Sequence, residues 1–126
     1  MQVKRVVSQL KLKYPGKKII MNNRNRPTEI VCEVEPTREH LDYSRAIAVI
    51  DKSLPHYHQK TTEEYRVIRG ILTLHVGSDV IPLKQSEKFT IFPDKLHWAE
   101  GKETWVECYS TPGWVFSDHI SSRPTT

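Results

Sequence analysis

Apolar and polar residues alternate in short runs along most of the chain, and these runs are rich in β-branched and aromatic residues. Runs of this kind, bounded by turn residues, are typical of β-strands. Glycine and proline mark turns at Gly70, Gly77, Pro93, Gly101 and Pro112. So many closely spaced strands predict an all-β domain, built as a single antiparallel β-barrel or sandwich. The clearest runs cover residues 29–34, 44–51, 64–69, 71–76, 88–92, 96–100 and 104–110.

The first 43 residues are less regular than the rest. Residues 3–13, VKRVVSQLKLK, have only weak helical periodicity and no clear cap, so we predict no helix there. The run KKIIM and the strand at 29–34 favour N-terminal strands, which with the loop at 35–43 would pack on the barrel or on a dimer partner. The barrel is expected at 44–120, and a disordered tail at 121–126.

Composition restricts the class of protein. A chain of 126 residues fits one domain, and 19 Lys and Arg against 15 Asp and Glu give a net charge of +4. No basic helix accompanies this excess, so we expect a solvated basic surface and no nucleic-acid partner. Cys32 and Cys108 form no CxxC pattern, which argues against a disulfide framework and a cysteine metal site. Without a signal-peptide pattern or an apolar run of membrane length, we expect a soluble, cytoplasmic protein with no membrane partner.

Residues 55–70, PHYHQKTTEEYRVIRG, contain the clearest candidate chemistry. In an extended segment His56 and His58 leave the same face, with their Cα atoms about 6.5 Å apart. Both imidazoles can then reach one metal ion. Histidines on a polar strand face are more often solvated than ligated, so this pair alone does not establish a metal site.

Two glutamates follow the histidines, and either is a candidate third ligand. Glu63 lies five residues beyond His58, which places it on the opposite face of an unbroken strand. A loop at residues 59–62, QKTT, would be needed to direct Glu63 back towards the histidines. In the strand that follows, Tyr65 shares the face of Glu63 while Glu64 faces away, so Tyr65 is a candidate pocket residue.

The complete stretch resembles the first motif of the cupin family, in which His-x-His is followed by four residues, Glu, six residues and Gly. HYHQKTTEEYRVIRG matches every fixed position, and the match selects Glu63 over Glu64. The second cupin motif supplies a fourth ligand, and aligning it on FPDKLHWAEG places that ligand at His97. The other positions depart from the motif, since its Gly, Pro, Gly and Asn are replaced by Ser86, Phe92, Asp94 and Gly101.

This resemblance implies a jelly-roll barrel of the small single-domain (RmlC-like) type over roughly residues 44–118, and a homodimer, which is common among small cupins. It also implies one divalent transition metal ion on His56, His58, Glu63 and His97. Mixed nitrogen and oxygen ligands suit Fe, Mn, Ni, Co, Cu or Zn. Three neutral imidazoles and one carboxylate leave about one positive charge, which attracts an anionic or enolisable ligand. If Glu63 left the metal, it would be a candidate catalytic base.

The cupin fold hosts many reactions, so the resemblance alone does not choose one. We expect a metal-dependent enzyme acting on a small polar or anionic substrate, such as a sugar or sugar-acid isomerase or epimerase, because HYHQKTTE looks like the corresponding motif of sugar-phosphate isomerases. An iron-dependent dioxygenase and a non-catalytic, metal-assisted sugar-binding module are the alternatives. His75 is expected to be a hydrogen-bonded histidine near the barrel wall, with a role beside the site or with substrate as the alternative. His119 lies past the last predicted strand, and the mouth of the pocket is a less favoured position for it.

Overall fold

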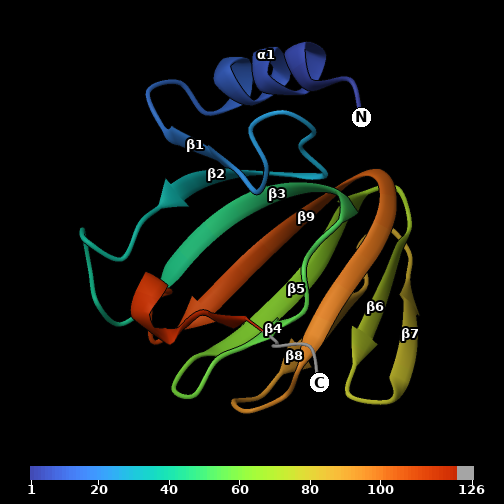
Figure 1. Ribbon diagram of the computed structural model, residues 1–126. Helices are drawn as coiled ribbons and strands as arrows, with labels where there is room; N and C mark the ends of the chain where they lie inside the picture. Colours follow the sequence, from blue (N-terminus) through green and yellow to red (C-terminus); the bar gives the residue numbers. More distant parts are fainter. Residues whose placement is uncertain (122–126) are drawn as a thin grey trace.

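Strands dominate the computed structural model, which describes residues 1–121 and confirms the predicted antiparallel β-barrel architecture (Figure 1). One helix and one 3₁₀ turn, η1, complete it. The elements follow in the order α1 (Val3–Lys13), β1 (Lys18–Met21), β2 (Glu29–Glu35), β3 (Ser44–Lys52), β4 (His56–Tyr57), β5 (Thr62–Arg69), β6 (Leu72–Val76), β7 (Asp79–Leu83), β8 (Lys88–Ile91), β9 (His97–Thr111), η1 (Phe116–Asp118) and β10 (Ile120–Ser121).

The strands form one strongly curled sheet in which every pairing is antiparallel. One wall runs β1, β2, β3, β9, β5 and β8, and the other contains β7, β6, β4 and β10. Strand β9 belongs to both walls, since its first residues pair with β6 and its later residues pair with β3 and β5. The long bent strand therefore closes the sheet around an interior (Figure 1).

The sequence predicted two strands and a turn where β9 is continuous. Ile50 pairs with Thr104, whereas Lys52 pairs with Glu100, so extra residues of β9 are accommodated in a bulge. A Cβ atom at Gly101 would collide with the Thr104 side chain and approach the carbonyl oxygen of Ile50. The glycine thus permits close packing inside a strand rather than a chain reversal, which is why the predicted turn was wrong.

The sequence also predicted no helix in the first residues, and α1 contradicts this. Val6 and Leu10, one turn apart, are fully buried on the outer face of the sheet, where they pack against Ile30, Ile47 and Trp105. The residue before the helix, Gln2, makes no side-chain cap, so local signals are weak. Packing of this narrow apolar stripe on the sheet, above β2 and β3 in Figure 1, stabilises the helix instead.

Successive residues of β2 point alternately to the outer and inner faces of the wall that contains β2 and β3. Ile30 and Cys32 are fully buried beneath α1, whereas Glu29, Val31 and Glu33 lie on the inner face. The inner core is made by residues that include Ile50, Tyr65, Val67, Leu72, Leu74, Val76, Leu83, Ile91 and Val106.

Three short strands, β4, β7 and β10, were not predicted, whereas the loop between β2 and β3 lies where the sequence placed it. The predicted tail at 121–126 begins at a residue of β10, and residues 122–126 lie outside the described part of the chain. The division of the chain at residue 44 stays a prediction, although β2 pairs directly with β3.

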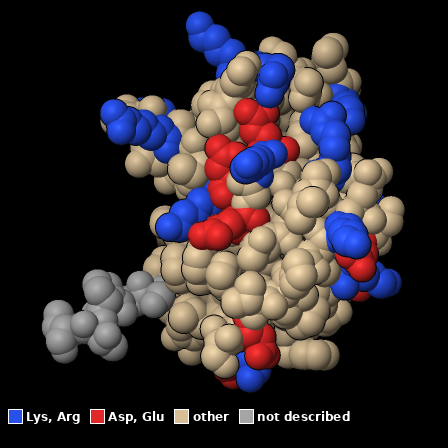
Figure 2. Space-filling view, turned by 90° about the vertical axis from the view of Figure 1, so that its right-hand side faces the viewer, with Lys and Arg blue, Asp and Glu red and all other residues tan. Residues whose placement is uncertain are grey.

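Surface charge is mixed on the face that Figure 2 shows. Acidic side chains gather in its upper middle among basic ones, and much of its lower part carries neither, so no continuous basic patch covers this face. The ion pair of Arg5 with Glu103, at 2.6 Å, joins α1 to β9. Within residues 1–121, no helix is both long enough and apolar enough to cross a membrane.

Candidate metal centre

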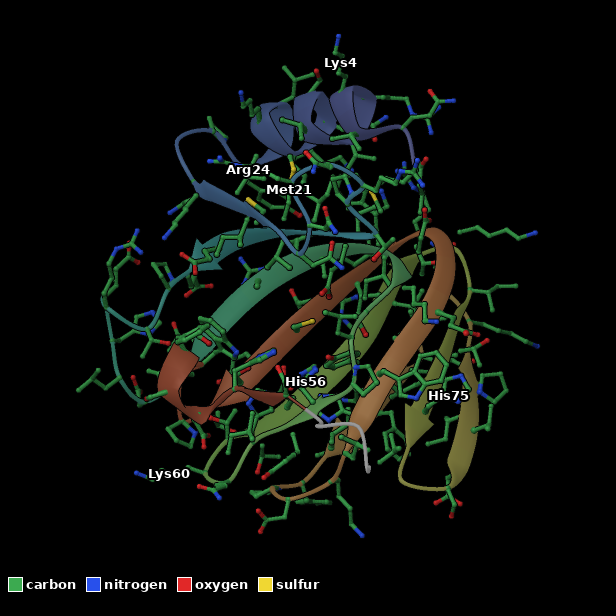
Figure 3. The ribbon with its side chains drawn as sticks, in the orientation of Figure 1. Lys4, Met21, Arg24, His56, Lys60 and His75 are labelled. Atoms are coloured by element: carbon green, nitrogen blue, oxygen red, sulfur yellow. The ribbon has the colours of Figure 1, made fainter. Side chains whose placement is uncertain are left out.

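The four ligands that the cupin resemblance implied lie together at one end of three strands. His56 of β4 is the register partner of His97, the first residue of β9, and Glu63 is the second residue of β5. The predicted break does occur between β4 and β5, and it returns Glu63 to the side of His58. One ligand atom from each of the four residues lies within 4.8 Å of the others, and their exposed fractions are 0–7%. Figure 3 shows His56 pointing into the barrel.

Glu64 lies elsewhere. Its side chain is exposed on the outer surface of β5, 3.9 Å from Lys88 Nζ. The structure therefore brings Glu63, and not its neighbour, to the three histidines.

Each of the three imidazoles is oriented by a backbone carbonyl. The ring Nδ1 atom lies 2.9 Å from a carbonyl oxygen in every case, so Nδ1 carries the proton and donates. In the neutral ring this leaves the Nε2 lone pair free, which is the form of histidine that binds metals. The donor and acceptor pairs are His56 with Leu54, His58 with Asp118, and His97 with Lys95.

The three Nε2 atoms converge on one oxygen of Glu63. Oε1 lies 2.6 Å from the Nε2 atom of His58, 3.1 Å from that of His97 and 3.9 Å from that of His56. Despite its short distance, the buried Nε2 atom of His58 makes no hydrogen bond of acceptable geometry to any described residue. Four acceptors facing each other in a buried space repel unless a proton or a cation lies between them.

A divalent ion fits this arrangement. Two atoms that are each about 2.1 Å from one ion lie about 3–4 Å apart, close to the separations found here. Burial raises the pKa of the Glu63 carboxyl, but the neighbouring rings of His56, His58 and His97 outweigh burial and lower that pKa well below its ordinary value. Glu63 is therefore ionised, as a metal ligand must be.

Asp118 connects the C-terminal segment to the metal-binding loop. Its carbonyl oxygen accepts the hydrogen bond from His58, and its carboxylate accepts three more from the backbone N–H groups of Gln59, Lys60 and Thr61, at 2.9–3.2 Å. Asp118 thus determines both the loop that returns Glu63 and the ring orientation of His58. No local pattern indicates this residue, because it is separated from its partners by 57–60 positions.

His119 lies directly beside the cluster. Its ring stacks on that of His56, with centroids 4.1 Å apart and planes 13° apart. Burial and the nearby imidazoles lower the pKa of His119 to about 4, so the ring is neutral. The Nε1–H group of Trp114 donates to its Nδ1 at 3.2 Å, which leaves the proton of His119 on Nε2.

His75 is not part of the site. It lies on β6, apart from His56 in Figure 3, and its ring stacks on Trp98 at a centroid distance of 3.8 Å. Its position at the barrel wall agrees with the expectation from the sequence. Its buried Nε2 atom has no hydrogen-bond partner among the described residues and lies 3.7 Å from a Glu100 oxygen.

A cavity of about 410 Å³ opens beside the four-residue cluster. Small side chains of β3, at Ser44, Ala46 and Ala48, form part of its wall and so leave the space. Leu54 and the largely exposed Phe116 contribute apolar surface. The polar residues that line it include His56, Glu63, Tyr65, His119 and Glu29.

Tyr65 lines this cavity, where the sequence predicted a pocket residue. Its ring is nearly perpendicular to that of His97, with centroids 6.0 Å apart. Burial and the charge of Glu63 raise the pKa of Tyr65 well above its usual value. The hydroxyl is therefore a permanent hydrogen-bond donor.

Glu29 is the residue of this cavity that sequence reasoning missed. Its carboxylate forms no hydrogen bond or ion pair with any described residue, whereas Glu35 on the same face pairs with Arg45 at 2.8 Å. Burial raises the pKa of Glu29 to about 7, with His56 lowering it and Glu63 raising it slightly. The sequence does contain one indication of this position, the alternation of residues along EIVCEVE, which places Glu29, Val31 and Glu35 on one face of β2.

No protein-family model matches the sequence, and no curated protein matches it. Solved structures do match the fold. Streptomyces Pac13, described as a nucleoside dehydratase, is 10% identical over 90% of each chain, with a TM-score of 0.75. KdgF from Halomonas sp. is 17% identical over 71% of this chain and 85% of its own, with a TM-score of 0.62. Iron(II) HppE is 8% identical over 76% of this chain and 56% of its own, with a TM-score of 0.66.

These structures are of the cupin type, and the chain has the cupin fold. The resemblance drawn from the first histidine motif is therefore confirmed at the level of the fold. The buried group of three histidines and one glutamate, which is able to hold a metal ion, accompanies that fold.

Proposed function

We propose that the protein is a metal-dependent enzyme for a small polar molecule, with His56, His58, Glu63 and His97 holding one divalent transition metal ion. The observation that supports this is the convergence of three imidazole lone pairs and one carboxylate at the wall of a cavity. Structural metal sites are closed by their ligands, whereas a site beside a cavity of this size is accessible to a substrate.

The ion would supply positive charge that polarises a substrate carbonyl or hydroxyl oxygen. The chain's own residues supply the rest of the site. Tyr65 and His119 offer an O–H and an N–H donor from the cavity wall, and Leu54 and Phe116 add apolar surface to it. Such donors suit a hydroxylated ligand, and we therefore favour isomerisation or epimerisation of a sugar or sugar acid. The similarity to Pac13, whose variants were solved with uridine, supports a sugar-bearing ligand.

Glu63 is best suited to the role of ligand. Its Oε1 atom lies within 3.1 Å of the Nε2 atoms of both His58 and His97, so acting as a base would require it to leave the cluster. An enzyme with this site needs another group for proton transfer, or a Glu63 that moves.

An iron-dependent dioxygenase is the second candidate. Three histidines and one carboxylate suit iron, and HppE, a similar structure, was solved as an iron(II) protein. A third outcome is a binding module that uses the ion to hold a sugar without turnover. A cytoplasmic homodimer of the RmlC-like type remains part of the proposal.

Reconstitution with a single metal separates these functions. Protein loaded with manganese or zinc is offered sugars and sugar acids in heavy water, and protein loaded anaerobically with iron is offered oxygen with catechol, thiol and keto-acid panels. We expect proton exchange in the first experiment and no oxygen uptake in the second. Oxygen uptake without exchange would establish the dioxygenase, and a rise in melting temperature with sugars but no reaction would establish the binding module.

A further inference from the structure

Glu29 is a carboxylate without a hydrogen-bond or ion-pair partner among residues 1–121. It lies at the start of β2, on the inner face of the wall, and its backbone is held in register opposite Ile50. The side-chain oxygen of Asn22 accepts a hydrogen bond from the backbone N–H of Glu29, but Asn22 makes no hydrogen bond to the Glu29 carboxylate. A partly buried carboxylate without a hydrogen bond destabilises the folded chain, so its presence at an inner position calls for a functional reason.

The neighbouring carboxylates on the inner face of β2 do not share this situation. Glu33 lies 3.5 Å from Arg38, and Glu35 is held by Arg45 and by the hydroxyl of Tyr43. Both are therefore compensated by their own surroundings. Glu29 alone among these three projects an uncompensated carboxylate into the cavity that His56 and Glu63 also line.

We propose that Glu29 is the proton-transfer residue of this cavity and that its substrate is a neutral hydroxycarbonyl compound, such as a ketose, lying between Glu29 and the four-residue cluster. This inference rests on the proposed metal-dependent function. It gives that function a base which does not have to leave the ligand set. The position of its carboxylate in the cavity wall, without an ion-pair partner among residues 1–121, supports it, and burial, which raises the pKa of Glu29, favours a carboxyl group that both takes and returns a proton.

The reaction requires no further reactant. An ionised Glu29 oxygen takes the proton from the carbon that bears a hydroxyl next to the carbonyl, forming an O–H bond as the C–H bond breaks. The electron pair of that C–H bond forms a carbon–carbon double bond, and the carbonyl pair moves onto the carbonyl oxygen. Return of the proton from Glu29 to the same face of the same carbon reverses the step, and its return to the former carbonyl carbon, with a proton shift between the oxygens, isomerises the compound.

The charge of the cavity indicates a neutral substrate rather than a phosphorylated one. Glu29, Glu33 and Glu35 all line it, and Arg45 is already engaged with two carboxylates, those of Glu35 and Glu107. A phosphate group would meet this acidic wall without a free cation among the lining residues that the structure describes. Hydroxyl groups, in contrast, can donate to the same oxygens.

The test uses dihydroxyacetone, L-erythrulose and D-xylulose as neutral probes, and dihydroxyacetone phosphate as the charged counterpart of the first. Manganese-loaded full-length protein is incubated with each probe in heavy water, and loss of the C–H signal is followed by proton NMR after the protein is removed. Glu29→Gln keeps the shape of the side chain and removes the base. Glu64→Gln makes the same change on the outer surface of the barrel.

We expect exchange with at least one neutral probe, slower exchange with dihydroxyacetone phosphate, and a fall of about 100-fold or more in Glu29→Gln. Bound manganese and the rise in melting temperature with the neutral probe should be unchanged in Glu29→Gln, which separates loss of the base from loss of the fold or of binding. Glu64→Gln should behave as the unmodified chain.

Equal exchange by Glu29→Gln and the unmodified chain would overturn the role of Glu29 while leaving the proposed function intact. Exchange confined to the phosphate, or no exchange with any neutral probe by chain that carries its full manganese, would overturn the substrate class. Failure of the unmodified chain to bind any metal would instead remove the proposed function, and the inference with it.

Discussion

The carbonyl oxygen of Asp118 accepts a hydrogen bond at 2.9 Å from Nδ1 of His58, a residue 60 positions earlier in the chain. The same aspartate binds three backbone N–H groups of the loop after His58 through its carboxylate. A residue that ligates nothing itself therefore orients one candidate ligand and the loop that returns another.

Replacing Asp118 with alanine should weaken metal binding without removing a ligand. The variant keeps the carbonyl oxygen that accepts from His58 but loses the carboxylate that holds the loop between His58 and Glu63. Because groups that position metal ligands from outside are typically worth 10–100-fold in affinity, we expect a loss of about that size. Three backbone N–H groups, of which that of Thr61 is buried, would also lose their acceptor, lowering the free energy of unfolding by about 1–3 kcal/mol. Competition with a chromophoric chelator and urea unfolding measure the two effects. Asp79→Ala, at the exposed first residue of β7, is the control, and equal metal affinity in the two variants would contradict this role.

Alanine at His56 or His97 should remove most of the metal that survives dialysis, because each change leaves three ligands and an open buried space. Glu63→Ala should weaken binding as well, since it removes the negative charge of the cluster. Elemental analysis of the dialysed protein gives the metal content per chain. Glu64→Ala, beside Glu63 but on the outer surface, should retain the full content. Unchanged content in both histidine variants would exclude this metal centre.

The stability of the metal-free protein should fall as pH rises, on account of Glu29. Its pKa in the folded chain is about 7, raised from 4.5 chiefly by burial, so between these values the folded chain binds more protons than the unfolded chain. The loss of folding stability that Glu29 causes is absent below pH 4.5 and grows until about pH 7. At 1.36 kcal/mol for each pH unit it reaches at most about 3 kcal/mol.

Glu29→Gln should therefore be more stable than the unmodified chain at pH 8 and nearly equal to it at pH 5. Urea unfolding at the two pH values, in the presence of a chelator, measures this difference. Glu64→Gln should give no such pH-dependent gain. A gain of the same size at both pH values would mean that Glu29 does not titrate in this range.

Trp114→Phe should weaken the binding of a ketose but not that of metal. The substitution keeps an aromatic ring and removes the N–H group that holds His119 in one tautomer. Loss of one hydrogen bond is worth about 0.5–1.5 kcal/mol, so we expect binding to weaken about 2–10-fold. Calorimetric titration of manganese-loaded protein with dihydroxyacetone measures it. Trp98→Phe, which changes the tryptophan stacked on His75 outside the site, should bind as the unmodified chain does.

Much of the barrel could be predicted from local pattern. Strands such as β2 and β5 alternate buried and partly exposed residues, so their apolar spacing reveals them in the sequence. The helix α1 and the unbroken course of β9 could not be predicted in this way. Burial of Val6 and Leu10 depends on a sheet that their own segment does not contain, and Gly101 has the local appearance of a turn until Thr104 and Ile50 are packed beside it.

Only part of the candidate site could be predicted from the sequence, again because a local pattern does not show which distant segments pack together. Spacing in the cupin-like motif identified His56, His58 and Glu63, because these residues are joined by one short loop whose length limits where they can point. His97 was identified from the second cupin motif, although the other fixed positions of that motif are not retained in this chain. Asp118 and Glu29 were missed, since an aspartate in a turn and a glutamate at the start of a strand are common at solvent-exposed positions too.

The sequence by itself determined the strand pattern and the antiparallel barrel class, which are properties of spacing that the chain carries locally. Its resemblance to the cupin motifs, and not spacing alone, implied the four residues able to hold a metal ion. The tertiary structure decided that Asp118 orients His58, that His119 stacks on His56, and that Glu29 faces the cavity without a partner. Whether a polar side chain is paired, exposed or left free inside the fold depends on which distant segments pack around it, and no local pattern contains that information.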